Sequence, residues 1–135
     1  MPSYSPEDVS ILSRTIYGEA RGCGFDGKTA VGWVVRNRAS KGGWFGASIA
    51  DVCVKPKQFS CWNDNDPNRA KLLAATITDK AFLECLSAAA AVLGSIVPDP
   101  TFGATHYHTL SVDPKWDDGK KPTVTIGQHV FYKDI

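Results

Sequence analysis

The feature that most constrains the fold of this 135-residue chain is a change in the spacing of its apolar residues near residue 100. Before that point apolar side chains recur every three or four residues, which is the period of an amphipathic helix. After it come short β-branched or aromatic runs separated by turn-forming residues, which indicate strands. Pro98 and Pro100 lie in the segment 95–102 that joins the two parts. The pattern therefore predicts an α+β fold, with a mostly helical body followed by a small C-terminal antiparallel β element.

Five helices are expected in the first part. The first runs from Pro6 to Arg21, because Ser5 is a good N-cap and proline suits the first helical position. Asp26 is the expected N-cap of the second helix, and the last helix is alanine-rich, so we expect close packing around it and a central, buried position. The other four helices are expected at 27–39, 48–54, 67–76 and 79–93, and the strands at 104–108, 123–126 and 129–132.

Glu19 lies between Gly18 and Gly22 in the last turn of the first expected helix, at the edge of its apolar stripe. The helix dipole and apolar neighbours both raise the pKa of a carboxyl group in such a place. A carboxyl that is protonated near neutral pH can act as a general acid, and glycosidases use one to protonate the leaving oxygen. Pairing with Arg21 would oppose this effect, and the alternative is that Glu19 is an ordinary surface residue at a helix end.

Charge and cysteine spacing exclude several classes of function. The net charge is +1, with 15 Lys and Arg against 14 Asp and Glu, so we expect no nucleic-acid partner and no membrane insertion. The longest apolar run, Ala88–Val97, is shorter than the roughly 20 residues of a membrane span. Cys23, Cys53, Cys61 and Cys85 form no C-x-x-C pair, so we expect free thiols, with Cys53 and Cys61 the easiest pair to bridge.

The polar and aromatic residues fit a polysaccharide groove. The aromatic rings that could stack on sugars are Trp44, Trp62, Tyr107, Trp116 and Tyr132, and the short hydrogen-bonding side chains are Gln58, Ser60, Asn63 and His129. The alternative is that many of these aromatic residues belong to the core. A rival interpretation is a catalytic zinc site built from His106, His108 and His129, with Glu19 as general base, since His106 and His108 share one face of an extended strand.

Six short blocks, in order over nearly the whole chain, resemble the cell wall hydrolases of the spore-cortex-lytic (SleB/CwlJ) type. They are Tyr17-Gly-Glu-Ala-Arg-Gly22, Ala30-Val-Gly-Trp-Val-Val-Arg-Asn-Arg38, Gln58-Phe-Ser-Cys-Trp62, Ala104-Thr-His-Tyr-His108, Pro114-Lys-Trp116 and Ile126-Gly-Gln-His-Val-Phe-Tyr132. The resemblance implies a lysozyme-like domain related to lytic transglycosylases that cleaves the β-1,4 bond between N-acetylmuramic acid and N-acetylglucosamine.

The resemblance also implies site residues. Glu19 is the expected catalytic acid, and the expected substrate-binding residues are Gln58, Ser60, Trp62, His106, Tyr107, His129 and Tyr132. Many relatives carry a second glutamate where this chain has Cys23, so Glu19 is the only acid of its motif. A single carboxylate is expected to act first as acid and then as base, giving an anhydro product, or a hydrolysed one if water attacks.

The resemblance extends to the biological setting. Residues 1–135 are expected to form a single catalytic domain without a wall-binding repeat or a visible signal peptide, which is typical of a phage endolysin made in the cytoplasm. Such an enzyme reaches the wall with the help of a holin-type protein. We expect a monomer that needs no cofactor and no metal. A non-catalytic wall-binding module is the remaining alternative.

Overall fold

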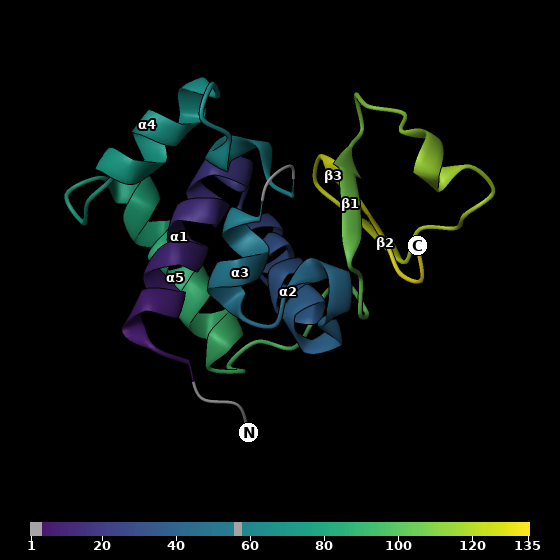
Figure 1. Cartoon of the computed structure of the whole chain (residues 1–135), viewed down its shortest axis with the longest axis horizontal. Coiled ribbons are helices and arrows are strands. Elements are labelled where there is room, and N and C mark those ends of the chain that lie inside the picture. The colour runs from purple at the N-terminus through teal and green to yellow at the C-terminus, as the bar shows by residue number, and fades with distance from the viewer. Residues whose placement is uncertain (1–3, 56–57) are drawn as a thin grey trace.

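The computed structural model describes residues 4–55 and 58–135, and it confirms the predicted α+β class. Figure 1 shows the helices gathered into one body, with the sheet beside it. The elements are α1 (Pro6–Ala20), α2 (Phe25–Lys41), α3 (Ile49–Val54), α4 (Pro67–Ala74), α5 (Lys80–Leu93), β1 (His106–Thr109), β2 (Val124–Ile126) and β3 (His129–Tyr132), with 3-10 turns η1 (Gly43–Phe45), η2 (Ser60–Trp62) and η3 (Lys115–Asp117). No described helix is long and apolar enough to cross a membrane.

Helix α1 begins where its capping residues predict. The Ser5 hydroxyl accepts a hydrogen bond from the Asp8 backbone N–H, and the Asp8 carboxylate accepts one from the Ser5 N–H, which is a reciprocal capping box. Leu12 and Ile16 are fully buried, so the predicted apolar stripe faces the core. The helix ends at Ala20, which leaves Glu19 in its last turn.

Helix α2 begins earlier than predicted. Its first residue is Phe25 and its N-cap is Gly24, which offers no side-chain cap, so the prediction that Asp26 is the N-cap is wrong. Asp26 lies in the first turn instead, where its charge still complements the helix dipole. A Cβ atom on Gly32 would lie 3.0 Å from Val92 Cγ2 and 3.4 Å from Ile16 Cδ1. The glycine therefore lets α2 approach α1 and α5 closely.

The central helix is α1, and the prediction that it is the alanine-rich α5 is wrong. Helix α1 packs against α2, α3, α4 and α5, whereas α5 packs against α1 and α2. One face of α5 is exposed to solvent, as Leu83 shows with 46% of its surface accessible. The alanine-rich composition of α5 indicated close packing, but the number of helices that pack against it depends on where those helices lie.

The three strands form an antiparallel sheet in the order β1-β3-β2. Tyr107 pairs with Phe131 and His106 pairs with Tyr132 across β1 and β3. Because successive residues of a strand point to opposite faces, Tyr107 and Phe131 share one face, and His106 and Tyr132 share the other. The predicted strands and the turn between Ile126 and His129 are confirmed within two residues.

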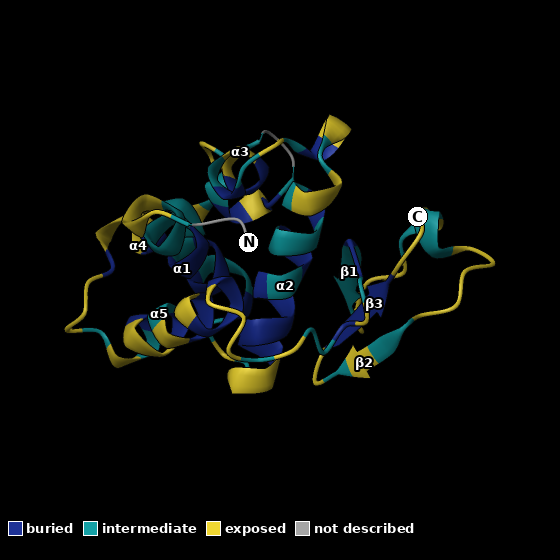
Figure 2. Cartoon of the chain, turned by 90° about the horizontal axis from the view of Figure 1, so that it is seen from below, coloured by how far each residue is buried: buried dark blue, intermediate teal, exposed yellow. Residues whose placement is uncertain are grey.

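The first of these faces docks the sheet on α2, as the view in Figure 2 shows. Ala30 and Val34 of α2 form a small apolar cluster with Ala104 and Phe131. Two polar side chains of α2 bind the backbone of the segment just before β1: Asn37 donates to the Ala104 carbonyl at 3.0 Å, and Arg38 Nε donates to the Thr105 carbonyl at 2.6 Å. The sheet is thus held against the helical body close to the end of α1.

Candidate active site

Glu19 is partly buried where the end of α1 meets the sheet. The Tyr107 hydroxyl, from β1, donates a hydrogen bond to Glu19 Oε1 at 2.5 Å. Tyr107 is itself held by ring contacts with Phe131, at 5.6 Å between centroids, and with His129, at 5.1 Å. The acid from the first helix and the phenol from the last third of the chain therefore form one polar pair.

Burial raises the pKa of Glu19 above its ordinary value. The Tyr107 hydroxyl, the Cys61 thiol and the positive charge of Arg38 offset part of this effect because each stabilises the carboxylate. The sequence left open whether Arg21 pairs with Glu19. In the structure Arg21 lies over the Tyr17 ring, 3.9 Å from its centroid, and donates to the Tyr17 carbonyl. The site thus holds an acid whose proton is retained to higher pH than usual.

Arg38 and Cys61 both stabilise the Glu19 carboxylate, and sequence analysis assigned neither of them to the site. Arg38 is buried and its Nη1 donates to Gln58 Oε1 at 2.8 Å, while its guanidinium lies over the Phe45 and Phe59 rings. The sequence does contain a signal for Arg38. It is a cationic residue that lies at helical spacing from Val31 and Val34, on the apolar face of α2. Such a residue is buried only where it finds hydrogen-bonding partners.

Gly18 makes room for Cys61 beside the acid. A Cβ atom at position 18 would lie 2.6 Å from Cys61 Cβ, 2.7 Å from Cys61 Sγ and 3.1 Å from Leu72 Cδ2. These distances are too short for any real side chain, so the residue before Glu19 has to be glycine for η2 to approach α1. Gly22 differs, since a Cβ atom there would meet nothing within 4 Å.

The central loop places its three predicted substrate-binding residues in different surroundings. Gln58 is partly buried and bound to Arg38, so it belongs to the network around Glu19. Ser60 is exposed, at the start of η2. Trp62 packs against the main core, and its indole N–H donates to Thr15 Oγ1 at 2.9 Å. The indole N–H is therefore already used inside the protein.

The four predicted sheet residues are split between the two faces. Tyr107 and His129 lie on the face toward α2 and Glu19, where their rings touch. His106 and Tyr132 lie on the opposite face, where both pack against the Trp116 ring, at 5.3 and 5.2 Å between centroids. The sequence could not show this division, so it placed all four beside one groove.

The predicted alternative of a three-histidine zinc site is wrong. His106 and His108 share a face of β1, as expected, but the pairing of Thr109 with His129 puts His129 on the other face. His129 Nδ1 instead faces Cys23 Sγ at 3.9 Å. The three imidazoles cannot converge on one ion across the sheet.

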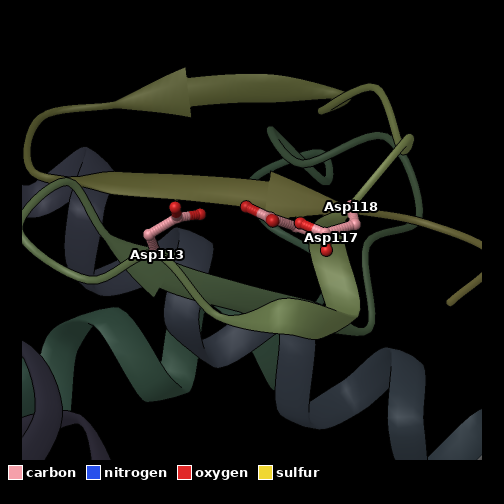
Figure 3. Close-up of side chains that lie close together, drawn as sticks. All are labelled: Asp113, Asp117 and Asp118. Atoms are coloured by element: carbon pink, nitrogen blue, oxygen red, sulfur yellow. The ribbon is translucent and has the colours of Figure 1, made fainter.

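Within residues 4–55 and 58–135, the only group of three side chains spaced to hold a metal ion is Asp113, Asp117 and Asp118, drawn in Figure 3. Asp113 and Asp118 are exposed. Asp117 already binds His108 Nε2 at 3.0 Å and accepts a hydrogen bond from the Tyr132 hydroxyl at 3.2 Å. This acidic group lies on the face of the sheet away from Glu19.

Comparison with known proteins identifies relatives over nearly the whole chain. A family model described as Cell Wall Hydrolase matches residues 22–132, starting just after Glu19. Spore cortex-lytic enzymes of Bacillus cereus and Bacillus subtilis are 27% and 28% identical over 131 and 134 residues, which are 96% and 95% of this chain but 46% and 38% of theirs. The chain thus spans less than half the length of these relatives.

Two solved structures share the fold. The catalytic domain of the Bacillus cereus SleB protein superposes with a TM-score of 0.74 at 25% identity, covering 98% of this chain and 94% of that one. The catalytic domain of the germination-specific lytic transglycosylase SleB from Bacillus anthracis superposes with a TM-score of 0.73 at 26% identity, covering 98% and 100%. The helical body and its three-stranded sheet are therefore the fold of the SleB catalytic domain.

Proposed function

This chain belongs to the cell wall hydrolase family, and we propose that it cleaves the β-1,4 bond between N-acetylmuramic acid and N-acetylglucosamine in peptidoglycan. The observation that carries the proposal is the hydrogen bond from Tyr107 to a Glu19 carboxyl whose pKa is raised by burial. Glycoside cleavage requires a carboxyl group that is protonated at the start of the reaction. Glu19 is a group of that kind, and it lies where the helical body and the sheet meet.

In the proposed reaction Glu19 acts twice. Its carboxyl group donates a proton to the glycosidic oxygen as the bond from C1 of the muramyl residue breaks and positive charge develops on the sugar ring. The resulting carboxylate then takes the proton of the muramyl 6-hydroxyl, whose oxygen attacks C1 to form the 1,6-anhydro product. Tyr107 and the charge of Arg38 stabilise the carboxylate between the two steps.

The positions of the other two glutamates favour this single-carboxylate route over hydrolysis. Glu7 is exposed in the first turn of α1, and Glu84 is exposed on α5, where it lies 3.5 Å from Lys28 Nζ. Neither glutamate accompanies Glu19, and the other carboxylate whose charge acts on it, Asp66, raises its pKa and is engaged as the N-cap of α4 by the Asn68 backbone N–H. The name of the Bacillus anthracis relative, a lytic transglycosylase, supports the same outcome.

The proposed sugar contacts are those that lie on the Glu19 side of the sheet. Gln58 and Ser60 come from the central loop and Tyr107 from the sheet, whereas the buried His129 packs against the Tyr107 ring and supports it. Trp62 supports the loop through its bond to Thr15. The His106 ring contacts both Phe45 and Trp116, and the Tyr132 ring contacts Trp116, so the geometry favours a role for both residues in holding the sheet.

Mass spectrometry of fragments released from purified peptidoglycan tests the proposal. Wild type is expected to release fragments with 1,6-anhydro-muramic ends, and Glu19→Gln is expected to release none, because the amide keeps the shape and loses the proton donor. Reducing muramic ends would show that water attacks instead. Equal release by a folded Glu19→Gln protein would refute the role of Glu19.

A non-catalytic wall-binding module is the second candidate, and the same experiment separates it. Such a module would sediment with peptidoglycan and release no fragments from it. We further propose that residues 1–135 act as one catalytic domain. The endolysin role and the holin-type partner stay predictions, which lysis of bacteria expressing the protein with and without a holin would test.

A further inference from the structure

Cys23 differs from the other three cysteines in its surroundings. All four are free thiols, and Cys53, Cys61 and Cys85 are buried in the core, where burial raises the pKa of each, to about 12 for Cys53 and about 11 for Cys85. Thiols of that kind are protonated and shielded from reagents. Cys23 is partly exposed, in the turn between α1 and α2. It is therefore the thiol that solvent reagents reach first.

A histidine stands beside this thiol. Cys23 Sγ lies 3.9 Å from His129 Nδ1. His129 is 96% buried, since only 4% of its surface is accessible, and its ring contacts both this thiol and the Tyr107 ring. Burial lowers the pKa of His129, so the imidazole is neutral near pH 7 and can accept a proton. Cys23 and His129 thus form a thiol–imidazole pair in which the imidazole can take the thiol proton.

The local structure fixes the thiol in place. The Cys23 backbone N–H donates to the Ala20 carbonyl at 2.9 Å, and the buried Lys28 ammonium donates to the Cys23 carbonyl. A Cβ atom on Gly27 would lie 2.8 Å from Cys23 Cβ, so the missing side chain at position 27 makes room for the cysteine. The orientation of Cys23 is thus built into the turn.

The thiol also lines a pocket. Its volume is about 360 Å³, within the range of roughly 300–1,000 Å³ that small ligands occupy. Its walls are the turn after α1, with Gly22, Cys23 and Gly24, and the turn between β2 and β3, with Gly127 and Gln128. Glycine and backbone make up much of this lining, so a group attached to the sulfur has space there.

We propose that Cys23, assisted by His129, is a site of reversible thiol–disulfide exchange with small-molecule disulfides, and that the attached group occupies this pocket. His129 accepts the thiol proton, and the Cys23 sulfur attacks one sulfur of the small disulfide. A new disulfide bond forms, the old one breaks, and the second sulfur leaves as a thiolate that takes up the proton. Cys23 is oxidised and the leaving sulfur is reduced, so no further oxidant is required.

The adduct has a consequence for the acid, and this step alone rests on the proposed function. The His129 ring contacts the Tyr107 ring, and the Tyr107 hydroxyl donates to Glu19. A group in the pocket replaces the thiol beside His129 with a disulfide and restrains the β2–β3 turn, and it therefore perturbs this chain of contacts. We expect the adduct to slow peptidoglycan release about tenfold, the effect of losing about 1.4 kcal/mol of transition-state stabilisation.

The site is tested by thiol kinetics on the folded protein without peptidoglycan. Reaction with 5,5′-dithiobis(2-nitrobenzoate) should show one fast thiol, which Cys23→Ser removes and the matched Cys85→Ser keeps. Asparagine cannot accept the thiol proton, so His129→Asn should slow the fast phase about tenfold or more, the scale of general-base assistance. Peptide mapping of wild type after reaction with glutathione disulfide should place the adduct on Cys23, whatever the folding of the variants.

A fast phase that survives in Cys23→Ser, or a Cys23 that reacts no faster than the buried thiols, would overturn the site. The activity test compares wild type with and without the glutathione adduct, and dithiothreitol should restore the rate. Cys23→Ser should release fragments at the wild-type rate and be insensitive to the disulfide. If the glutathione adduct releases peptidoglycan fragments as fast as reduced wild type, the expected effect on activity is refuted. Reduced wild type that releases nothing would instead refute the proposed function, while the kinetics still decide the site.

Discussion

Replacing Tyr107 by phenylalanine isolates the hydrogen bond on which the proposed mechanism depends. The ring and its contacts with Phe131 and His129 remain, and only the hydroxyl that lies 2.5 Å from Glu19 Oε1 is lost. A hydrogen bond to a charged group contributes about 1.5–3 kcal/mol. This hydrogen bond lowers the pKa of Glu19, so the substitution should raise that pKa further above its ordinary value.

The sign of the effect on activity follows from the role of the acid. Glu19 has to be protonated at the start, so the rate falls as pH rises through its pKa, which already lies above the ordinary 4.5. Tyr107→Phe should therefore move this alkaline limb to higher pH. At lower pH, where both proteins are protonated, the variant should be about tenfold slower because the carboxylate formed during cleavage has lost a donor.

The assay is the initial rate of peptidoglycan solubilisation measured across the pH range. Tyr17→Phe is the matched control, because the Tyr17 hydroxyl also donates to a carboxylate at 2.5 Å, that of Asp79, and lies two residues before Glu19. It should lower stability and leave the alkaline limb where wild type has it. An alkaline limb that stays in place in Tyr107→Phe would refute the claim that Tyr107 stabilises the Glu19 carboxylate.

Three further substitutions test the site and its support. Glu19→Gln should raise the melting temperature by an amount that is near zero at acid pH and grows as pH rises, since a raised folded-state pKa means that ionisation of Glu19 destabilises the fold. Burial lowers the pKa of His106 to about 4, so its contribution to stability is complete above its ordinary pKa of 6.5 and is lost as pH falls toward 4. Because the side chain is only half buried, solvent screening reduces the effect, and His106→Gln should remove about 1–2 kcal/mol of that acid sensitivity in urea titrations. Gly18→Ala should cost about 1–3 kcal/mol because of its clash with Cys61, and Gly22→Ala, measured in the same way, should cost much less.

The elements of the fold were predictable from local signals. Ser5, Asp66 and Asp79 each accept backbone hydrogen bonds as N-caps at the helix starts that the sequence indicated. The turn between β2 and β3 was also predictable, because a glycine between two strand patterns indicates a turn. In the structure Gly127 has a φ of 58°, a backbone conformation that favours glycine. Asp26 misled because α2 starts two residues earlier than predicted, from a glycine cap that leaves no side-chain signal.

The site was predictable only in part, because it depends on contacts between distant segments. Glu19 stood out as an acid at the end of an apolar helix, and the structure places it beside Tyr107, 88 residues away. Which face of the sheet each residue takes depends on register, and a shift of one residue would exchange the faces. The burial of Arg38 depends on the Thr105 carbonyl and Gln58, neither of which adjoins it in the sequence.

The three groups that stabilise the Glu19 carboxylate come from three different parts of the structure. Tyr107 belongs to β1, Cys61 to η2 and Arg38 to α2. Arg38 also donates a hydrogen bond to the Thr105 carbonyl, just before β1. If the sheet moves away from α2, Tyr107 withdraws from the acid and Arg38 loses the Thr105 carbonyl. The pKa of Glu19 therefore depends on how the sheet is docked, so a substitution in the Ala30, Val34 and Phe131 cluster should shift the pH profile as well as the stability. A change in stability alone would show that the acid and the docking of the sheet are independent.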